Sequence, residues 1–200
     1  MSPPPRREPD APALTGLVLA GGRGRRLGRD KALVTVAGEP LVVRAPRRLE
    51  ACCERVFVAS GDGRRLGDLE WEQIPDAVAD GGPLAGILAG LEFATTPLLA
   101  VVAVDLPYLN PDVLRRLAVE WRGEAAVVPL VSGRVHPLHG AYATDSAPRL
   151  RRLLLGGSRA VITALSQLGA RVVGEECWGD LDPSGSFVYN INRPEDLEGL

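Results

Sequence analysis

A short apolar run that leads into a glycine-rich basic loop constrains the fold of this chain more than any other feature. Residues 17–20 are all apolar and predict a buried β-strand. Glycines follow at positions 21, 22, 24 and 28. Glycine lets the backbone turn sharply and brings its amide groups close to a ligand. A strand that ends in such a loop indicates an anion site in an α/β domain.

The cations of this loop indicate that the anion is a phosphate. Arg23, Arg25, Arg26 and Lys31 place positive charge around the backbone N–H groups. The chain has 23 Lys and Arg residues, and Lys31 is its single lysine. An ammonium is compact enough to sit between phosphate oxygens, whereas a guanidinium is a broad planar fork. We therefore expect Lys31 to contact phosphate.

Two common phosphate motifs do not match the loop. The Walker pattern requires Ser or Thr after its lysine, but Ala32 follows Lys31. The dinucleotide fingerprint G-x-G-x-x-G requires a shorter spacing than the glycines at 22, 24 and 28 give. The sequence therefore disfavours both a P-loop NTPase and a nicotinamide enzyme.

Strands that alternate with helices predict a three-layer α/β/α fold with a mainly parallel, Rossmann-like sheet. We expect strands at 17–20, 55–59, 98–104, 125–131, 138–143 and 171–174. We expect helices at 41–51, 86–94, 112–121, 146–155 and 159–168, and a short one from Pro194. Asn110 is a plausible cap for the third of these helices. Pro46 should kink the first helix or shift its start.

Composition bounds the domain and its surroundings. Two hundred residues with 46% hydrophobic content fit one globular domain, expected over residues 13–200, after a disordered proline-rich tail at 1–12. A net charge of −2 gives no support to nucleic-acid binding, and the longest apolar run is too short to span a membrane. The three cysteines lack metal-ligand spacing, so we expect reduced thiols and a cytoplasmic location.

Asp105 is the best candidate for a metal ligand. It directly follows the apolar run 98–104, and ligands bind at the carboxyl ends of the strands in such sheets. Mg²⁺ favours one or two carboxylates together with phosphate oxygens and water. The alternative is an aspartate that caps the next turn.

The loop also resembles a known signature. Leu19-Ala-Gly-Gly, Arg26-Leu-Gly and Asp30-Lys31 are similar to the L-A-G-G-x-x-x-R-M-G-x-D-K pattern of molybdenum cofactor guanylyltransferases, within the wider nucleoside-triphosphate transferase group. The resemblance implies a sheet of the nucleotide-diphospho-sugar transferase type and a loop that wraps a triphosphate. It implies catalytic roles for Arg26, Lys31 and Asp105. It also implies a nucleotide site made by Leu19, Ala20, Gly21, Gly22, Lys31, Asp76 and Asp105.

Three further stretches resemble the same family. Val104-Asp-Leu-Pro is similar to its C-D-x-P, which implies that Asp105 binds Mg²⁺. Asp76 precedes a Gly-Pro-Leu-Ala-Gly stretch that approaches the nucleotide in the family, although its helix entry could be purely structural. An asparagine common after the second strand is replaced here by Ala59-Ser60, so either a side chain is lost there or the backbone and Ser60 substitute.

The resemblance assigns the second half of the domain to an acceptor. Asn190 and Asn192 match an N-x-N motif, and they and Arg159 are the implied acceptor-binding residues. Arg159 and Asn192 also have structural readings, as a solvated side chain and as an Asx turn. A role in acceptor contact is open for one of the histidines of His136-Pro-Leu-His139, whereas a metal site made by the pair is disfavoured.

The implied reaction is the transfer of GMP from GTP to the terminal phosphate of molybdenum-molybdopterin, with release of pyrophosphate. A phosphate nucleophile is anionic and needs no protein base, which suits a chain without a convincing Ser-His-Asp arrangement. Gly21 implies guanine, because related transferases with other nucleotides read L-A-A-G. The alternatives are CTP, another phosphorylated acceptor such as a sugar, corrinoid or phospholactate, or a non-catalytic nucleotide sensor. Transient contact with molybdoenzymes or their chaperones is a further expectation.

Overall fold

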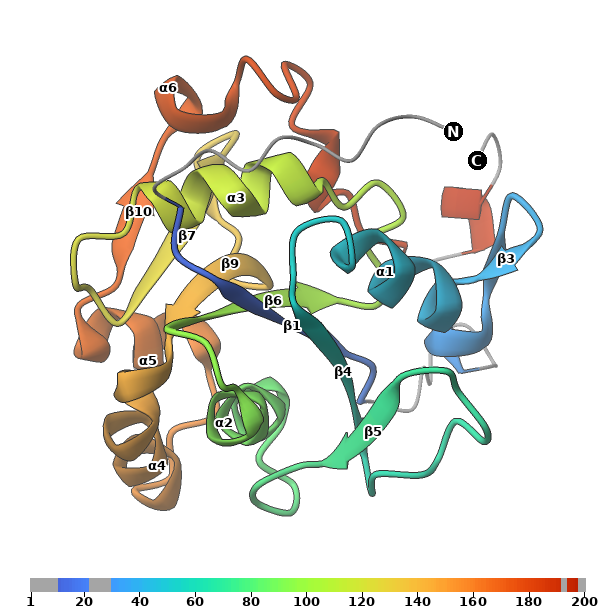
Figure 1. Cartoon of the computed structure of the whole chain (residues 1–200), viewed down its shortest axis with the longest axis horizontal. Coiled ribbons are helices and arrows are strands. Elements are labelled where there is room, and N and C mark those ends of the chain that lie inside the picture. Colours follow the sequence, from blue (N-terminus) through green and yellow to red (C-terminus); the bar gives the residue numbers. More distant parts are fainter. Residues whose placement is uncertain (1–10, 22–29, 192–193, 198–200) are drawn as a thin grey trace.

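The computed structural model describes residues 11–21, 30–191 and 194–197. Within these residues, a central sheet of eight strands runs through the molecule, with helices on both faces (Figure 1). The strand order is β10 (Arg171–Val173), β7 (Ala126–Val131), β9 (His139–Ala143), β6 (Leu98–Ala103), β1 (Leu14–Leu19), β4 (Arg55–Gly61) and β5 (Glu72–Pro75), while β8 (Arg134–Val135) pairs with β7. A separate hairpin joins β2 (Thr35–Val36) to β3 (Glu39–Pro40).

The sheet is mainly parallel, as the sequence predicts. Strands β6, β1, β4 and β5 are parallel neighbours, and so are β10 and β7. Strand β9 runs antiparallel to both of its neighbours, and β8 is antiparallel to β7. The carboxyl ends of β1, β4, β5 and β6 therefore meet at one edge of the sheet, which is the edge that carries the candidate site.

The helices form the two outer layers (Figure 1). One face is covered by α1 (Leu41–Leu49), α3 (Pro111–Val119) and α6 (Glu175–Trp178), and the other by α2 (Pro83–Phe93), α4 (Ala147–Leu155) and α5 (Val161–Leu168). Short 3-10 helices lie at η1 (Lys31–Leu33), η2 (Thr144–Ser146), η3 (Ser186–Val188) and η4 (Pro194–Leu197).

Each face of the sheet has its own hydrophobic core. Alternate residues of a strand point to opposite faces, so Val18 of β1 belongs to the core under α1 and α3, whereas Leu17 belongs to the core under α2, α4 and α5. Every residue of β1 and β6 is buried. This double burial explains why both strands are nearly continuous apolar runs rather than alternating ones.

Helix α2 packs unusually close to β1 because of a glycine. A Cβ added at Gly86 would lie 2.7 Å from Leu19 Cδ2, 3.4 Å from Ala59 Cβ and 3.4 Å from an oxygen of Asp76. Gly86 thus lets the first turns of α2 approach the ends of three strands. Gly82 is the N-cap residue with φ of 63°, and Pro83 opens the helix, which therefore begins before the expected start at residue 86.

Most expected elements are present, with differences at their ends and in the edge strands. Asn110 caps α3 by accepting a hydrogen bond from Asp112 N at 2.9 Å. Helix α1 begins at Leu41 even though Pro46 lies inside it, so the proline does not shift its start. The helix expected at 159–168 begins at Val161, and the last one is a 3-10 turn. Strands β2, β3, β5 and β8 and helix α6 were not predicted, because they are short and their patterns are weak.

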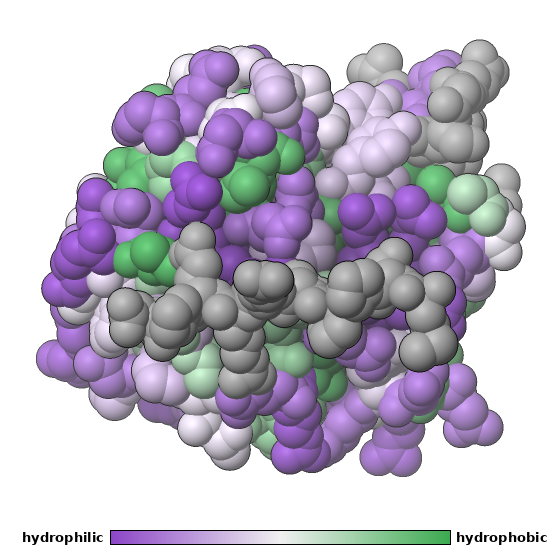
Figure 2. Space-filling model, turned by 45° about the horizontal axis from the view of Figure 1, so that its top comes forward, coloured by the Kyte–Doolittle hydropathy of each residue, from purple (hydrophilic) through white to green (hydrophobic). Residues whose placement is uncertain are grey.

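Hydrophilic residues cover most of the face drawn in Figure 2, and its hydrophobic patches are separate from one another. The large apolar side chains that are exposed include Leu130, Leu155 and Ile162, which come from different elements. None of the described helices is both long enough and apolar enough to cross a bilayer.

Candidate functional site

The end of β1 forms the centre of the candidate site. Ala20 N donates to Ala59 O at 2.9 Å, and Val104 N donates to Leu19 O at 3.1 Å, so the first strand is tied to β4 and to the residue after β6. The side chains of Leu19 and Ala20 are buried. Gly21 is exposed, and a Cβ added there would meet nothing within 4 Å. Leu19 and Ala20 therefore belong to the buried end of β1, while Gly21 is free of close contacts with the other described residues.

Lys31 and Asp105 form an ion pair at this edge. Lys31 Nζ donates to Asp105 Oδ2 at 2.9 Å, and the two side chains are 23% and 15% exposed. Lys31 begins η1, whose N-cap Asp30 accepts a hydrogen bond from Ala32 N at 3.1 Å. Residues 74 positions apart thus meet because the parallel strands β1 and β6 end side by side.

The ion pair holds a cation and a carboxylate that can each bind a ligand of the opposite charge. Before a ligand binds, each group compensates the other in a partly desolvated place. A bound anion can accept hydrogen bonds from the ammonium of Lys31, and a cation that accompanies the anion can take the carboxylate of Asp105. The geometry therefore suits an anionic ligand that arrives together with a cation.

The residues present fit a hard divalent cation on these terms. In the described parts of the chain, no three His, Cys, Asp or Glu side chains gather where they could hold a metal ion. Mg²⁺ needs only one or two protein carboxylates when phosphate oxygens and waters fill its other positions. Asp105 can supply one such carboxylate at the mouth of the site.

Asp76 lies at the same edge, directly after β5. Its backbone N donates to Gly61 O at 2.9 Å, and its carboxyl group lies beside Gly86 at the start of α2. Partial burial raises the pKa of Asp76 above its usual value, because desolvation disfavours the charged form. A ligand that donates hydrogen bonds to Asp76 would stabilise the charged carboxylate, which is disfavoured while no ligand is bound.

Arg65 is a residue of the site that the sequence alone does not reveal. Its Nε donates to Ser60 O at 3.1 Å, and its two terminal nitrogens donate to Ala20 O and to the carboxylate of Asp30. The chain has several adjacent arginine pairs, and nothing in the sequence distinguishes Arg64-Arg65 from the others. Its place in the loop between β4 and β5, at the carboxyl edge, is the one signal that could have found it.

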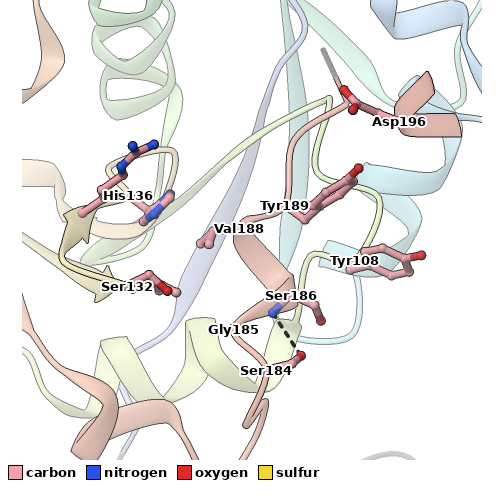
Figure 3. A pocket seen from close by; sticks show the side chains of 11 residues that line it. Tyr108, Ser132, His136, Ser184, Gly185, Ser186, Val188, Tyr189 and Asp196 are labelled. Atoms are coloured by element: carbon pink, nitrogen blue, oxygen red, sulfur yellow. Dashed lines mark hydrogen bonds between the residues drawn. The ribbon is translucent and has the colours of Figure 1, made fainter. Parts of the chain in front are cut away.

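A second candidate region is a pocket of about 760 Å³, whose lining includes Tyr108, close after Asp105 in the chain. Tyr108 and Tyr189 lie on one side of it, and Ser132 and His136 lie on the other (Figure 3). The two tyrosine rings are 6.2 Å apart between centroids. The pocket is joined to the ion pair through the backbone, because Ile191 N donates to Asp105 O at 3.0 Å.

A cluster of aromatic rings packs behind the segment that lines this pocket. Phe187 of η3 is fully buried between His139 and Trp178, with centroid distances of 4.7 Å and 5.1 Å. Asp182 fixes η3, because its Oδ2 accepts hydrogen bonds from Phe187 N at 2.9 Å and from Ser186 Oγ at 3.0 Å. The segment that lines the pocket is therefore held in place by both packing and hydrogen bonds.

The two histidines have different environments. His139 is completely buried, which lowers its pKa to about 3, and its Nε2 accepts a hydrogen bond from Asn110 N at 3.3 Å. It is therefore a neutral core residue at physiological pH. His136 lines the pocket, and partial burial lowers its pKa. Of the pair, His136 is the one placed to meet a ligand.

Comparison with known proteins gives a consistent family. The model of the MobA-like NTP transferase domain matches residues 16–187. The molybdenum cofactor guanylyltransferase of Cereibacter sphaeroides is 36% identical over 189 residues, with 92% of this chain and 93% of that protein covered. The probable molybdenum cofactor guanylyltransferase of Chloroflexus aggregans is 32% identical over 192 residues, with 92% of each covered.

A solved structure agrees with the sequences. Molybdopterin-guanine dinucleotide biosynthesis protein A from Archaeoglobus fulgidus superposes with a TM-score of 0.81 at 29% identity, covering 92% of this chain and 95% of the other. The chain belongs to the MobA-like NTP transferase family. It is therefore a nucleotidyltransferase, and the resemblance read from the glycine-rich loop is confirmed.

The predicted site residues of this MobA-like transferase fall into three groups. Gly22, Arg26 and Asn192 lie outside the described residues. The structure brings together the residues around the ends of β1, β5 and β6, which are Leu19, Ala20, Gly21, Lys31, Asp76 and Asp105. Asn190 and Arg159 form the third group.

These two acceptor candidates lie apart from the centre. Asn190 is exposed, between Tyr189 of the pocket and Ile191, which binds the backbone of Asp105. Arg159 donates through Nη1 to Leu154 O and to Ser158 O, both at 2.9 Å, at the end of α4. It does not line the pocket, and its visible role is to satisfy carbonyl groups at a helix end.

Cysteine chemistry does not enter the site. Cys52, Cys53 and Cys177 are free thiols, and burial raises the pKa of Cys177 to about 11. Cys52 and Cys53 have their sulfur atoms 3.5 Å apart and lie half-buried at the end of α1. Cys177 is thus the buried thiol of the three, while the adjacent pair is half-buried.

Proposed function

We propose that this transferase moves GMP from GTP to the terminal phosphate of molybdenum-molybdopterin, giving the guanine dinucleotide form of the cofactor and pyrophosphate. The observation that carries the proposal is the Lys31–Asp105 pair at the edge where β1 and β6 end. The names of the relatives at 32–36% identity support guanosine as the nucleoside and a molybdenum cofactor as the acceptor.

The residues at the edge account for the handling of the triphosphate. The ammonium of Lys31 donates to phosphate oxygens and offsets the charge that builds up as pyrophosphate leaves. The carboxylate of Asp105 holds Mg²⁺, which when bound neutralises phosphate charge and orients the reacting groups. Gly21 leaves room next to the nucleoside, because none of the described residues would lie within 4 Å of a Cβ at this position.

We place the acceptor in the pocket of Tyr108, His136 and Tyr189. Its volume of about 760 Å³ is suited to a molecule of cofactor size. The tyrosine rings offer apolar faces to a flat heterocycle, while Arg134 and His136 of the lining offer polar groups. Tyr108 of the pocket follows Asp105 closely in the chain, and Ile191 N donates to Asp105 O, so we expect an acceptor phosphate to approach the α-phosphorus of GTP from that side.

No protein base is needed in this scheme. The acceptor phosphate is an anion at neutral pH and attacks directly, so the chain has to align it and screen charge. The neutral, buried His139 fits this view, because it stays in the core and takes no proton from the acceptor.

The decisive test measures pyrophosphate release with GTP, CTP, ATP and UTP, each with and without molybdenum-molybdopterin. We expect release with GTP only when the acceptor is present, together with a new dinucleotide by mass spectrometry. Release with CTP but not GTP would refute the choice of nucleotide. Tight GTP binding without any turnover would instead favour a nucleotide-sensing module.

Asp76 should show opposite effects on stability and on binding. Its pKa is raised in the folded state, so the native protein holds this proton more tightly than the unfolded chain, whose aspartates titrate near pH ~3.9. Stability therefore falls as the pH rises through the window between the two pKa values. Asp76→Asn removes this penalty, and we expect a higher Tm than wild type at pH 7.5.

The same substitution should raise KM for GTP by about tenfold, because a hydrogen bond to a charged group is lost. The gain in Tm should disappear at a pH below the window, where the carboxyl group is protonated in both states. The exposed Asp68 supplies a control, and Asp68→Asn should change neither Tm nor KM. A lower Tm for Asp76→Asn at pH 7.5 would contradict this description of the site.

A further inference from the structure

Arg65 connects three segments of the chain that meet beneath the triphosphate site. Its guanidinium group binds Ala20 O at the end of β1, Ser60 O in β4 and the carboxylate of Asp30. Ala20 and Asp30 stand on the two sides of the glycine-rich stretch of the sequence. Arg65 thereby ties the end of β1 to the start of η1.

The contacts continue from Asp30 to the ion pair. One carboxylate oxygen of Asp30 accepts from Arg65, while the other caps η1 by accepting from Ala32 N. Lys31 is the first residue of η1, and its ammonium reaches Asp105. The site therefore contains a row of charges of alternating sign, which runs from Arg65 through Asp30 and Lys31 to Asp105.

We propose that Arg65 is a positioning residue for the transfer reaction, which holds Lys31 in place through Asp30 and keeps the Asp30 carboxylate from acting on the triphosphate. This inference rests on the proposed function, because it names the triphosphate as the ligand that Lys31 serves. Arg65 acts through Asp30 and the backbone, and it needs no contact with substrate.

The geometry explains why an arginine is required. A guanidinium offers five N–H donors in a rigid fork, so one side chain can bind two carbonyl oxygens and a carboxylate at the same time. A lysine has the charge but a single nitrogen at the end of a flexible stem. Arg65 and Asp30 are each 21% exposed, so their pairing is partly shielded from solvent.

The electrostatic argument concerns Asp30. This carboxylate is adjacent in sequence to Lys31 and would repel a triphosphate bound at the same edge. Without Arg65, it would also compete with the triphosphate for the ammonium of Lys31. Arg65 compensates the charge, so its loss should weaken phosphate binding even where the fold is kept.

Ser60 contacts Arg65 through its backbone rather than its side chain. Ser60 is fully buried, and its Oγ has no hydrogen-bond partner among the described residues. The carbonyl oxygen of Ser60 accepts from Arg65 instead. Ser60 therefore contributes to the edge of the sheet through its backbone, which holds Arg65.

The test compares Arg65→Gln, Arg65→Lys, Asp30→Asn and the double variant Arg65→Gln/Asp30→Asn. Calorimetry measures Kd for tripolyphosphate and for GTP with Mg²⁺, and kcat and KM are measured with acceptor. Tripolyphosphate reports on the phosphate site alone, so a failure of the guanylyl-transfer assignment would leave this readout intact. The matched control is Arg64→Gln, because Arg64 is the exposed neighbour.

We expect Arg65→Gln to raise Kd for tripolyphosphate by tenfold or more, with a larger change in KM than in kcat, and Arg64→Gln to stay within twofold of wild type. Asp30→Asn retains an oxygen that can cap η1 while it removes the charge. The double variant should therefore bind tripolyphosphate more tightly than Arg65→Gln alone. If Arg65 had only a structural role, the double variant would bind tripolyphosphate more weakly than Arg65→Gln, because the losses from the two substitutions would add.

Arg65→Lys should fold and bind with intermediate affinity, since it restores charge without the three contacts. It keeps the inference testable if Arg65→Gln does not fold. Wild-type affinity in Arg65→Lys and Arg65→Gln, or no recovery in the double variant, would overturn the inference. Such a result would leave the proposed function standing if wild-type protein still releases pyrophosphate from GTP.

Discussion

Asp105→Asn should lower kcat for pyrophosphate release by about 10²- to 10³-fold, which is the size of effect seen when one preorganised electrostatic group is removed. Asparagine has nearly the same shape but cannot offer Mg²⁺ a charged oxygen. Its amide can still accept from Lys31, so the fold should remain intact. The effect should therefore appear in turnover at saturating GTP, in a steady-state assay with acceptor.

Two comparisons separate this effect from a general loss of structure. The exposed Asp68 serves as a matched control, and Asp68→Asn should keep wild-type kcat. Asp105→Asn should also lose the tightening of GTP binding that Mg²⁺ produces in wild type. A variant that turns over within threefold of wild type at saturating Mg²⁺ would show that Asp105 only caps a turn.

Lys31→Met should reduce kcat/KM for GTP by a similar factor, about 10²- to 10³-fold, because the positive charge next to the leaving pyrophosphate is lost. Methionine keeps the length and apolar character of the stem. The Asp105 carboxylate loses its partner in a partly buried place, so a drop in Tm should accompany the loss of activity.

Lys31→Arg separates the two roles of this lysine. The guanidinium can still pair with Asp105, so we expect a Tm near that of wild type. It should not restore turnover, because a planar fork fits poorly where a compact ammonium sits between phosphate oxygens. Full activity in Lys31→Arg would show that charge alone is needed, and that the single lysine of the chain has no special geometric role.

The layered fold could be predicted from the sequence because its central strands are almost entirely apolar. β1 and β6 are buried on both faces, so their apolar runs are continuous and stand out. The short strands β5 and β8 lie at the periphery of the sheet, where partial exposure leaves no clear pattern. The antiparallel direction of β9 could not be read at all, since direction depends on the path of the connections.

The centre of the site was predictable for a related reason. Lys31 and Asp105 each end a recognisable pattern, a glycine-rich loop in one case and a buried strand in the other. Arg65 carries no such pattern, because its role depends on three acceptors that come from distant parts of the chain. The pocket proposed for the acceptor could not be predicted either, since Tyr108, His136 and Tyr189 meet only after the sheet is assembled.

The central claim is that Lys31 and Asp105 together receive a nucleoside triphosphate and its cation at the carboxyl edge of the sheet. Isothermal titration of GTP into the wild-type protein, in Mg²⁺ and then in EDTA, tests it most directly. We predict saturable binding at one site that is tighter with Mg²⁺, and loss of that Mg²⁺ effect in Asp105→Asn. No detectable heat of GTP binding under either condition, with folded protein, would contradict the account.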